Sequence, residues 1–220
     1  MSSAQHPRPG IRRAVAAGFA IPTIVCLALA AYFVRDRVSI AIESKWAIGI
    51  YHGPSPCALR SPDTIENPVL TAADVTDVSA RFVADPFMIR RGGMWYMFFE
   101  VMNGASGHGD IGLAVSAGGS TWRYRGIVLD EPFHLSFPYV FVWNDTLYMV
   151  PESATAGAIR LYRATAFPRK WELVGELVRG KLADSAPFHA DGVWWILSCG
   201  APWSHDTLRL FYASSLGGPY

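Results

Sequence analysis

Ala84-Asp85-Pro86-Phe87-Met88-Ile89 is the stretch that decides the fold, together with Met94–Glu100, which follows a turn at Gly92-Gly93. Short runs rich in aromatic and β-branched residues, bounded by glycine turns, are typical of β-strands. Two further strands are expected at 110–116 and 121–124, because a glycine-rich loop and a Gly118-Gly119 turn separate them. This unit therefore predicts four short antiparallel strands.

The same arrangement recurs along the chain with a period of about fifty residues. Tyr96, Tyr148 and Trp195 are equivalent in this register, and so are three alanines, Ala114, Ala164 and Ala213. Four strands per repeat of about 45–50 residues is the blade of a β-propeller. A sandwich of two sheets is the alternative, but it does not explain the fixed period.

We therefore predict an all-β, partial propeller with blades at 81–130, 131–180 and 181–220. The third blade holds three strands, so about two and a half to three blades are present. A closed ring needs four to eight blades, and we expect the chain to be part of a larger propeller. Residues 35–80 form a linker, in which Trp46–Tyr51 is our candidate for a ring-closing strand.

The N-terminal region predicts a membrane segment. Residues 14–34 are uncharged, and a helix of this length spans about 31 Å. Residues 1–13 are then a cytoplasmic tail, and the membrane is a partner through this helix. A cleaved signal peptide is the alternative, since Ala28-Leu29-Ala30 has the form of a cleavage site. Either interpretation places the folded part on the periplasmic or other extracytoplasmic (lumenal) side.

The composition argues against some classes of binding partner. The net charge is +1 and only 17% of residues are charged, which argues against nucleic acid. Aromatic residues make up 13%, which suits either a β core or stacking on sugar rings. Cys57 and Cys199 either pair in an oxidising compartment or stay as two buried free thiols, which we favour.

Candidate catalytic residues lie where the first strand of each blade begins, because these strands line the axial channel. The equivalent positions are Asp85, then Phe137 or Pro138, then Asp184. Two carboxylates that face one cleft suit general acid–base work on a glycosidic bond. We therefore place Asp85 and Asp184 in a candidate carbohydrate site.

Further candidates surround these two aspartates. Glu100 and Glu152 end equivalent second strands. Glu100 is a ligand-binding candidate, and Glu152 either points into the cleft as a catalytic residue or caps its strand. His134 is either a structural histidine or a ligand-binding residue that shuttles a proton. Tyr139 stands near the channel and can stack on a sugar.

His108 and Asp110 flank Gly109 and invite a ligand or metal interpretation, but we favour a solvated turn. We predict no metal and no cofactor.

The repeat units resemble a known superfamily. Ala84–Phe87 followed by Trp95–Phe99, with Asp110–Ser116 and Trp122, is similar to the first blade of the family 43 glycoside hydrolases. More narrowly, four stretches resemble the N-terminal domain of glucosamine inositolphosphorylceramide transferases and their bacterial relatives: Asn67–Thr71, Glu131–Ser136, Pro151–Ser153 and Leu161–Ala164.

The resemblance implies a five-bladed propeller directed at carbohydrate, with a glycan or glycolipid as partner. It implies that Asp85 is the catalytic base and that Asp184 tunes the pKa of a general acid located beyond Tyr220. The function is then hydrolase-like or associated with a glycosyltransferase. The alternative is a non-catalytic module that binds glycan or supports a transferase.

Overall fold

The computed structural model describes residues 45–200 and 207–220, which belong to one compact unit, Ser44–Tyr220. The predicted tail at 1–13 and the apolar segment at 14–34 lie outside the described residues. Within the described part, no helix has the length and apolar character needed to cross a membrane.

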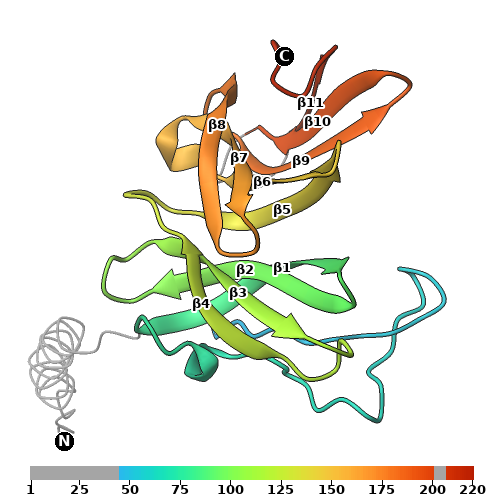
Figure 1. Ribbon diagram of the computed structural model, residues 1–220. Helices are drawn as coiled ribbons and strands as arrows, with labels where there is room; N and C mark the ends of the chain where they lie inside the picture. Colours follow the sequence, from blue (N-terminus) through green and yellow to red (C-terminus); the bar gives the residue numbers. More distant parts are fainter. Residues whose placement is uncertain (1–44, 201–206) are drawn as a thin grey trace, which may run out of the picture. The chain divides into compact units, whose positions relative to one another are not determined.

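The described chain is all-β, as predicted, and folds into three antiparallel sheets (Figure 1). In each sheet the strands pair with their neighbours in sequence, which is the meander expected of a blade. The first sheet contains β1 (Ala80–Arg91), β2 (Met94–Asn103), β3 (Gly109–Ser116) and β4 (Arg123–Leu129). The second contains β5 (Ser136–Trp143), β6 (Thr146–Glu152), β7 (Ala158–Ala166) and β8 (Lys170–Arg179). The third contains β9 (Ala183–Ala190), β10 (Val193–Cys199) and β11 (Leu208–Ala213).

Two-residue turns join the first two strands of every sheet. Both central residues have positive φ at Gly92-Gly93, at Asn144-Asp145 (46° and 60°) and at Asp191-Gly192 (53° and 76°). Tight hairpins favour this backbone because it matches the twist of the strands, and Gly, Asn and Asp tolerate it best. The sequence-based prediction of these three turns is confirmed.

Apolar side chains fill the spaces between successive sheets. Phe98 and Leu113 from the first sheet form a buried cluster with Met149 and Tyr162 from the second. A second cluster joins the second and third sheets, and it includes Trp194. Each sheet therefore buries one face against its neighbour, as stacked blades must.

The segment before β1 differs from our expectation. Trp46–Tyr51 does not form a strand, because its pairing is limited to a single bridge between Ile48 and Leu70. The side chain of Asn67 occupies the next backbone position by accepting from Ile50 N and donating to Ile50 O, each at 2.8 Å. An amide side chain thus replaces the strand partner, while Ile48 and Ile50 pack on the core of the first sheet.

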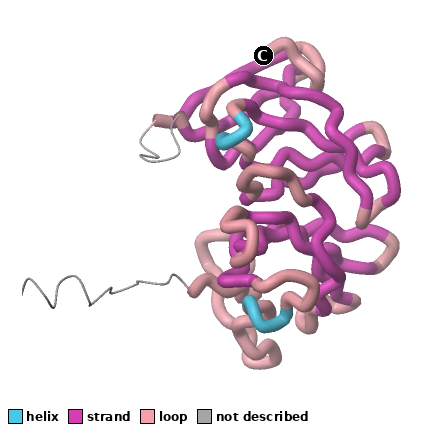
Figure 2. Tube along the Cα trace, turned by 90° about the vertical axis from the view of Figure 1, so that its left-hand side faces the viewer, coloured by secondary structure: helices cyan, strands magenta, loops and turns pink. Residues whose placement is uncertain are grey.

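Two short 3-10 helices, at Ala72–Asp74 and Ala154–Ala156, are the only helical turns in the described residues (Figure 2). Cys57 and Cys199 are both free. The favoured prediction of free thiols is confirmed, but neither thiol is buried: Cys57 is exposed in the polar loop before β1, and Cys199 is half-buried.

Candidate functional site

A strand irregularity recurs at the start of the first strand in all three sheets. Asp85, Phe137 and Asp184 have φ values of 51°, 43° and 51°, in the left-handed region. Strand pairing slips at each of these places, as in a β-bulge. A non-glycine residue in this region costs on the order of 1–3 kcal/mol and is concentrated at functional sites, where a bulge redirects a side chain. The three positions aligned from the sequence are therefore structurally equivalent.

Two glutamates stand beside these bulges. Glu100 pairs with Ala84 on β1, and Glu152 pairs with Ser136 on β5, so each lies one residue from the irregularity. Both are buried, at 5% and 9% exposure. The third sheet has Cys199 at this register position, opposite Ala183.

His134 lies between the two glutamates. Its Nε2 is 3.6 Å from Glu100 Oε1 and 3.8 Å from Glu152 Oε2. Its Nδ1 accepts a hydrogen bond from Gly109 N at 2.9 Å. An Nδ1 that accepts a hydrogen bond carries no proton, so the ring is neutral and its proton sits on Nε2, facing the glutamates.

Gly109 allows this approach because it has no side chain. A Cβ at position 109 would meet the Leu135 carbonyl oxygen and would lie 2.9 Å from His134 Cε1. Leu135 N in turn donates to Gly109 O at 2.9 Å. The loop before β3 therefore fixes both the position and the tautomer of His134.

Both carboxylate oxygens of Glu152 accept hydrogen bonds from residues close to it in the second sheet. Ser136 Oγ donates to Glu152 Oε2 at 3.0 Å, and Ala154 N donates to Oε1 at 2.7 Å. Glu152 thus links the start of β5 to the turn after β6, which is the capping role considered from the sequence.

Glu100 has a different electrostatic environment. Burial raises its pKa from 4.5 to about 8, and the negative charges of Asp85, Glu152 and Asp184 add to the increase. Because His134 is neutral, it does not offset this effect. Glu100 is therefore mostly a neutral acid at pH 7, surrounded by three other carboxyl groups.

Asp85 and Asp184 are more accessible, since both are half-buried. Asp85 Oδ2 accepts from Phe137 N at 3.3 Å, which links the bulge of the first sheet to that of the second. The Phe87 ring packs against Phe137 and Tyr139, with centroids 4.8 and 5.4 Å away. Tyr139 is half-buried in this aromatic group, beside Phe141.

The structure thus brings together the acidic residues that the sequence singled out. Asp85, Asp184 and Glu152 each contribute to the electrostatic environment of Glu100, and His134 contacts both glutamates. We call Asp85, Glu100, Glu152 and Asp184 the carboxylate group. It offers a neutral acid, hydrogen-bond acceptors and ionisable groups within one region, which suits hydroxyl-rich ligands and proton transfer.

Sequence reasoning missed three contributors. Ser136 and Gly109 were not singled out, although Gly109 is flanked by polar residues in a buried strand. Asp110 was interpreted as part of a solvated turn, but it is 1% exposed on β3, paired with Val101. That interpretation is wrong, because β3 begins at Gly109 and carries Asp110 into an almost continuously buried strand.

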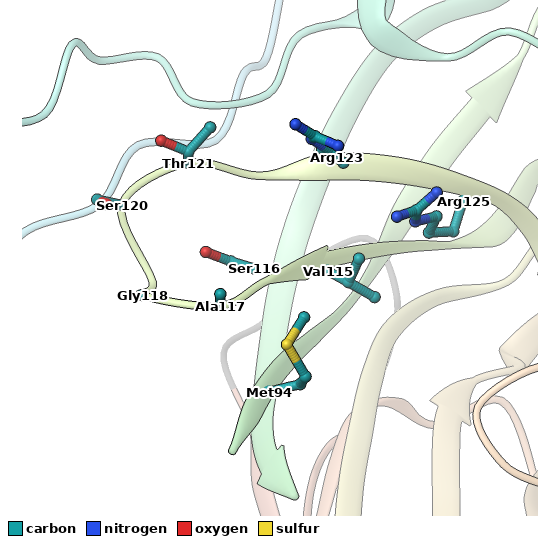
Figure 3. A pocket seen from close by; sticks show the side chains of 9 residues that line it. All are labelled: Met94, Val115, Ser116, Ala117, Gly118, Ser120, Thr121, Arg123 and Arg125. Atoms are coloured by element: carbon teal, nitrogen blue, oxygen red, sulfur yellow. The ribbon is translucent and has the colours of Figure 1, made fainter. Parts of the chain in front are cut away.

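Two cavities lie away from the carboxylate group, beside the first sheet. One of about 390 Å³ surrounds the β3–β4 turn and includes Arg123, Arg125 and Met94 (Figure 3). Another, of about 560 Å³, is lined by Tyr51, Trp95 and Trp122 among others. Neither contains a member of the carboxylate group.

Residues 40–220 match the protein family described as glucosamine inositolphosphorylceramide transferase 1, N-terminal. Proteins named glucosamine inositolphosphorylceramide transferase 1 are similar to the chain in Oryza sativa subsp. japonica and in Arabidopsis thaliana. The rice protein is 35% identical, over 100% of this chain and 33% of its own length. The Arabidopsis protein is 38% identical, over 79% of this chain and 25% of its own length. The chain therefore spans at most about a third of these relatives.

Solved structures with this fold include carbohydrate-active enzymes. An exo-β-1,3-galactanase from Phanerochaete chrysosporium superposes with a TM-score of 0.63 at 18% identity, covering 77% of this chain and 41% of the enzyme. An arabinanase from Bacillus subtilis gives 0.55 at 16% identity, covering 74% of this chain and 62% of the enzyme. At these identities the likeness is one of fold.

Proposed function

Because the chain belongs to the family of N-terminal domains of glucosamine inositolphosphorylceramide transferase 1, we propose that it is a membrane-tethered propeller domain that recognises a glycan or glycolipid. The observation that carries this proposal is the carboxylate group. Its four acidic side chains come from three sheets, and two of them stand at the strained start of a first strand. The relatives' name supports a glycolipid headgroup that contains inositol phosphate, with glucosamine as the sugar.

In the catalytic form of this proposal, Asp85 is the general base. A half-buried carboxylate at a bulge can accept a proton from water or from a sugar hydroxyl. Asp184 stands at the equivalent bulge of the third sheet and shares the electrostatic environment of Glu100. The hydrolase-like fold supports this arrangement of roles.

In the alternative form, the domain binds glycan without catalysis and supports a transferase. Three hydrogen bonds favour it. Asp85 Oδ2 accepts from Phe137 N, and both carboxylate oxygens of Glu152 accept hydrogen bonds within the protein. Carboxylates held in this way position strands and leave fewer acceptors for chemistry.

Asp85→Asn in the complete protein separates the two forms. The amide keeps the shape and one acceptor oxygen, so the free energy of unfolding should change by at most about 1 kcal/mol. If Asp85 is the base, glycan turnover should fall about a hundredfold or more while binding of intact glycan survives. A variant that melts several degrees lower, with unchanged turnover per folded molecule, would show that Asp85 is a structural clamp.

The membrane tether is a proposal from the sequence. The uncharged segment at 14–34, with Arg12 and Arg13 before it, supports an N-terminus in the cytoplasm and an exported propeller. An alkaline phosphatase fused after Tyr220 should be active. An inactive fusion, with activity from a cytoplasmic reporter at the same place, would contradict export.

A further inference from the structure

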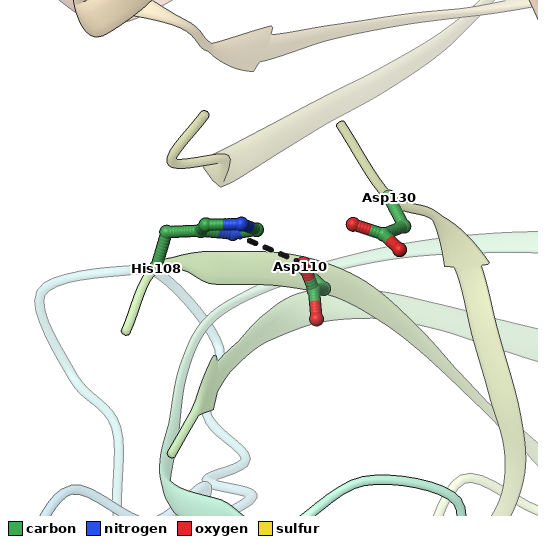
Figure 4. A group of neighbouring side chains, drawn as sticks. All are labelled: His108, Asp110 and Asp130. Carbon is green, nitrogen blue, oxygen red and sulfur yellow. Dashed lines mark ion pairs between the residues drawn. The ribbon is translucent and has the colours of Figure 1, made fainter. Parts of the chain in front are cut away.

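A second group of potential ligands lies next to the carboxylate group. His108 immediately precedes β3, Asp110 is the second residue of β3, and Asp130 follows the end of β4 (Figure 4). One donor atom from each of the three residues lies within 4.8 Å of the others. The sequence analysis considered His108 and Asp110 as possible metal ligands but favoured a solvated turn, and Asp130 was not among its candidates.

Two buried polar atoms in this group have no hydrogen-bond partner. Asp110 is 1% exposed, yet its Oδ1 accepts no hydrogen bond. His108 Nδ1 is likewise buried and without a hydrogen bond, although it lies 3.3 Å from Asp110 Oδ1. Leaving buried polar atoms unsatisfied costs about 1–3 kcal/mol each, so such a pair calls for an explanation.

The other oxygen of Asp110 is held in place. Asn103 Nδ2 donates to Asp110 Oδ2 at 2.9 Å, and Asn103 Oδ1 accepts from Ala105 N at 3.0 Å. This bond orients the carboxylate so that Oδ1 is turned toward His108 Nδ1. Outer-sphere hydrogen bonds of this kind orient metal ligands in proteins.

The charges of the group are also unbalanced. Among the residues that the structure describes, no lysine or arginine forms an ion pair with Asp110 or Asp130. A divalent cation would compensate both carboxylates at once.

We propose that His108, Asp110 and Asp130 bind a divalent transition-metal ion of the zinc class. Bonds of about 2.0–2.1 Å place two ligand atoms of a tetrahedral ion about 3.3–3.4 Å apart. The distance of 3.3 Å between His108 Nδ1 and Asp110 Oδ1 fits this spacing. Imidazole with two carboxylates suits zinc or manganese better than calcium, which takes six to eight oxygens.

The site connects to the carboxylate group through Gly109. This residue lies between two of the proposed ligands, and its N–H fixes the tautomer of His134. A bound ion would restrain the loop before β3, and with it the amide that holds His134. Asp130 is exposed, so water reaches the site and would supply the remaining ligands of a bound ion.

Isothermal titration of the EDTA-treated full chain with ZnCl2, MnCl2 and CaCl2 tests the proposal. We expect one Zn²⁺ per chain, with binding at least tenfold weaker in Asp130→Asn and in Asp110→Asn. Asp130 is exposed, so its variant keeps the test valid if Asp110→Asn fails to fold. Asp145→Asn is the matched control, because Asp145 lies in the β5–β6 turn with φ 60°, which asparagine tolerates.

Three outcomes would overturn the proposal. The first is the absence of stoichiometric Zn²⁺ binding by the unaltered chain, which would leave an ion pair between His108 and Asp110 as the explanation. The second is binding that is unchanged in Asp130→Asn and in His108→Ala, which would assign the zinc to other histidines. The third is Ca²⁺ binding as tight as Zn²⁺ binding, which would indicate an oxygen-only site.

Discussion

Replacing Glu100 by glutamine should remove a large part of the pH dependence of stability. Burial and three neighbouring carboxyl groups raise the pKa of Glu100 from 4.5 to about 8. The folded protein therefore keeps a proton on Glu100 that the unfolded chain releases above about pH 4.5. The amide of glutamine imitates the neutral acid at every pH.

The direction in which stability changes with pH follows from proton linkage. Below about pH 4.5 both states are protonated, and the raised pKa has no destabilising effect. Between about pH 4.5 and 8 the folded state binds more protons, so its stability falls as pH rises, by at most about 1.4 kcal/mol per pH unit. The loss of stability over this pH range is about 5 kcal/mol at most. Because Glu100 is coupled to the other carboxyl groups, this loss is shared among the titrations of all of them.

Urea unfolding at pH 5, 6, 7 and 8 measures this effect. The unaltered chain should lose stability steadily across the series, whereas Glu100→Gln should lose much less and should be the more stable of the two at pH 8. Glu172→Gln is the control, because the Glu172 side chain is 61% exposed in a surface pair with Arg163. Parallel curves for the unaltered chain and Glu100→Gln would refute the buried neutral acid.

Two further predictions concern the packing that holds the site together. Phe98 is fully buried between the first two sheets, against Phe167 and Trp171, so Phe98→Ala should lower the free energy of unfolding by about 3–5 kcal/mol in urea titrations. A loss no larger than that of Val142→Ala, at an exposed position, would contradict this packing. Asn67→Ala removes both hydrogen bonds to Ile50 and should cost about 2 kcal/mol by the same measurement, while Glu66→Ala, at an exposed neighbour, should cost little. Equal losses for these two variants would show that the amide does not secure this segment.

Much of the fold is predictable because its signals are local. The hairpin turns need residues that tolerate positive φ, and Gly92-Gly93, Asn144-Asp145 and Asp191-Gly192 supply them at the expected places. The alignment of Asp85 with Asp184 follows from the repeat. The strand predicted at Trp46–Tyr51 is absent, because the side chain of Asn67 takes the place of a strand partner at Ile50, and strand propensity does not reveal such a contact.

The candidate site was harder to predict than the fold, because it depends on contacts between sheets. The position of His134 between Glu100 and Glu152 follows from the register of two sheets and from the close approach that Gly109 permits. The burial of Asp110 was not predicted, because the glycine and histidine beside it suggest a polar turn. Its pairing with Val101 in the sheet buries it. Residue types identified the candidates, but packing determined their environments.

We place glycan binding at the carboxylate group, two of whose members lie at the strained starts of first strands. Amide hydrogen exchange in the complete protein tests this most directly, comparing mixed micelles with and without inositolphosphorylceramide. We expect slower exchange at 84–88, 136–139 and 183–186 when the glycolipid is present. Protection confined to the cavity lined by Tyr51, Trp95 and Trp122, or no protection at all, would contradict it.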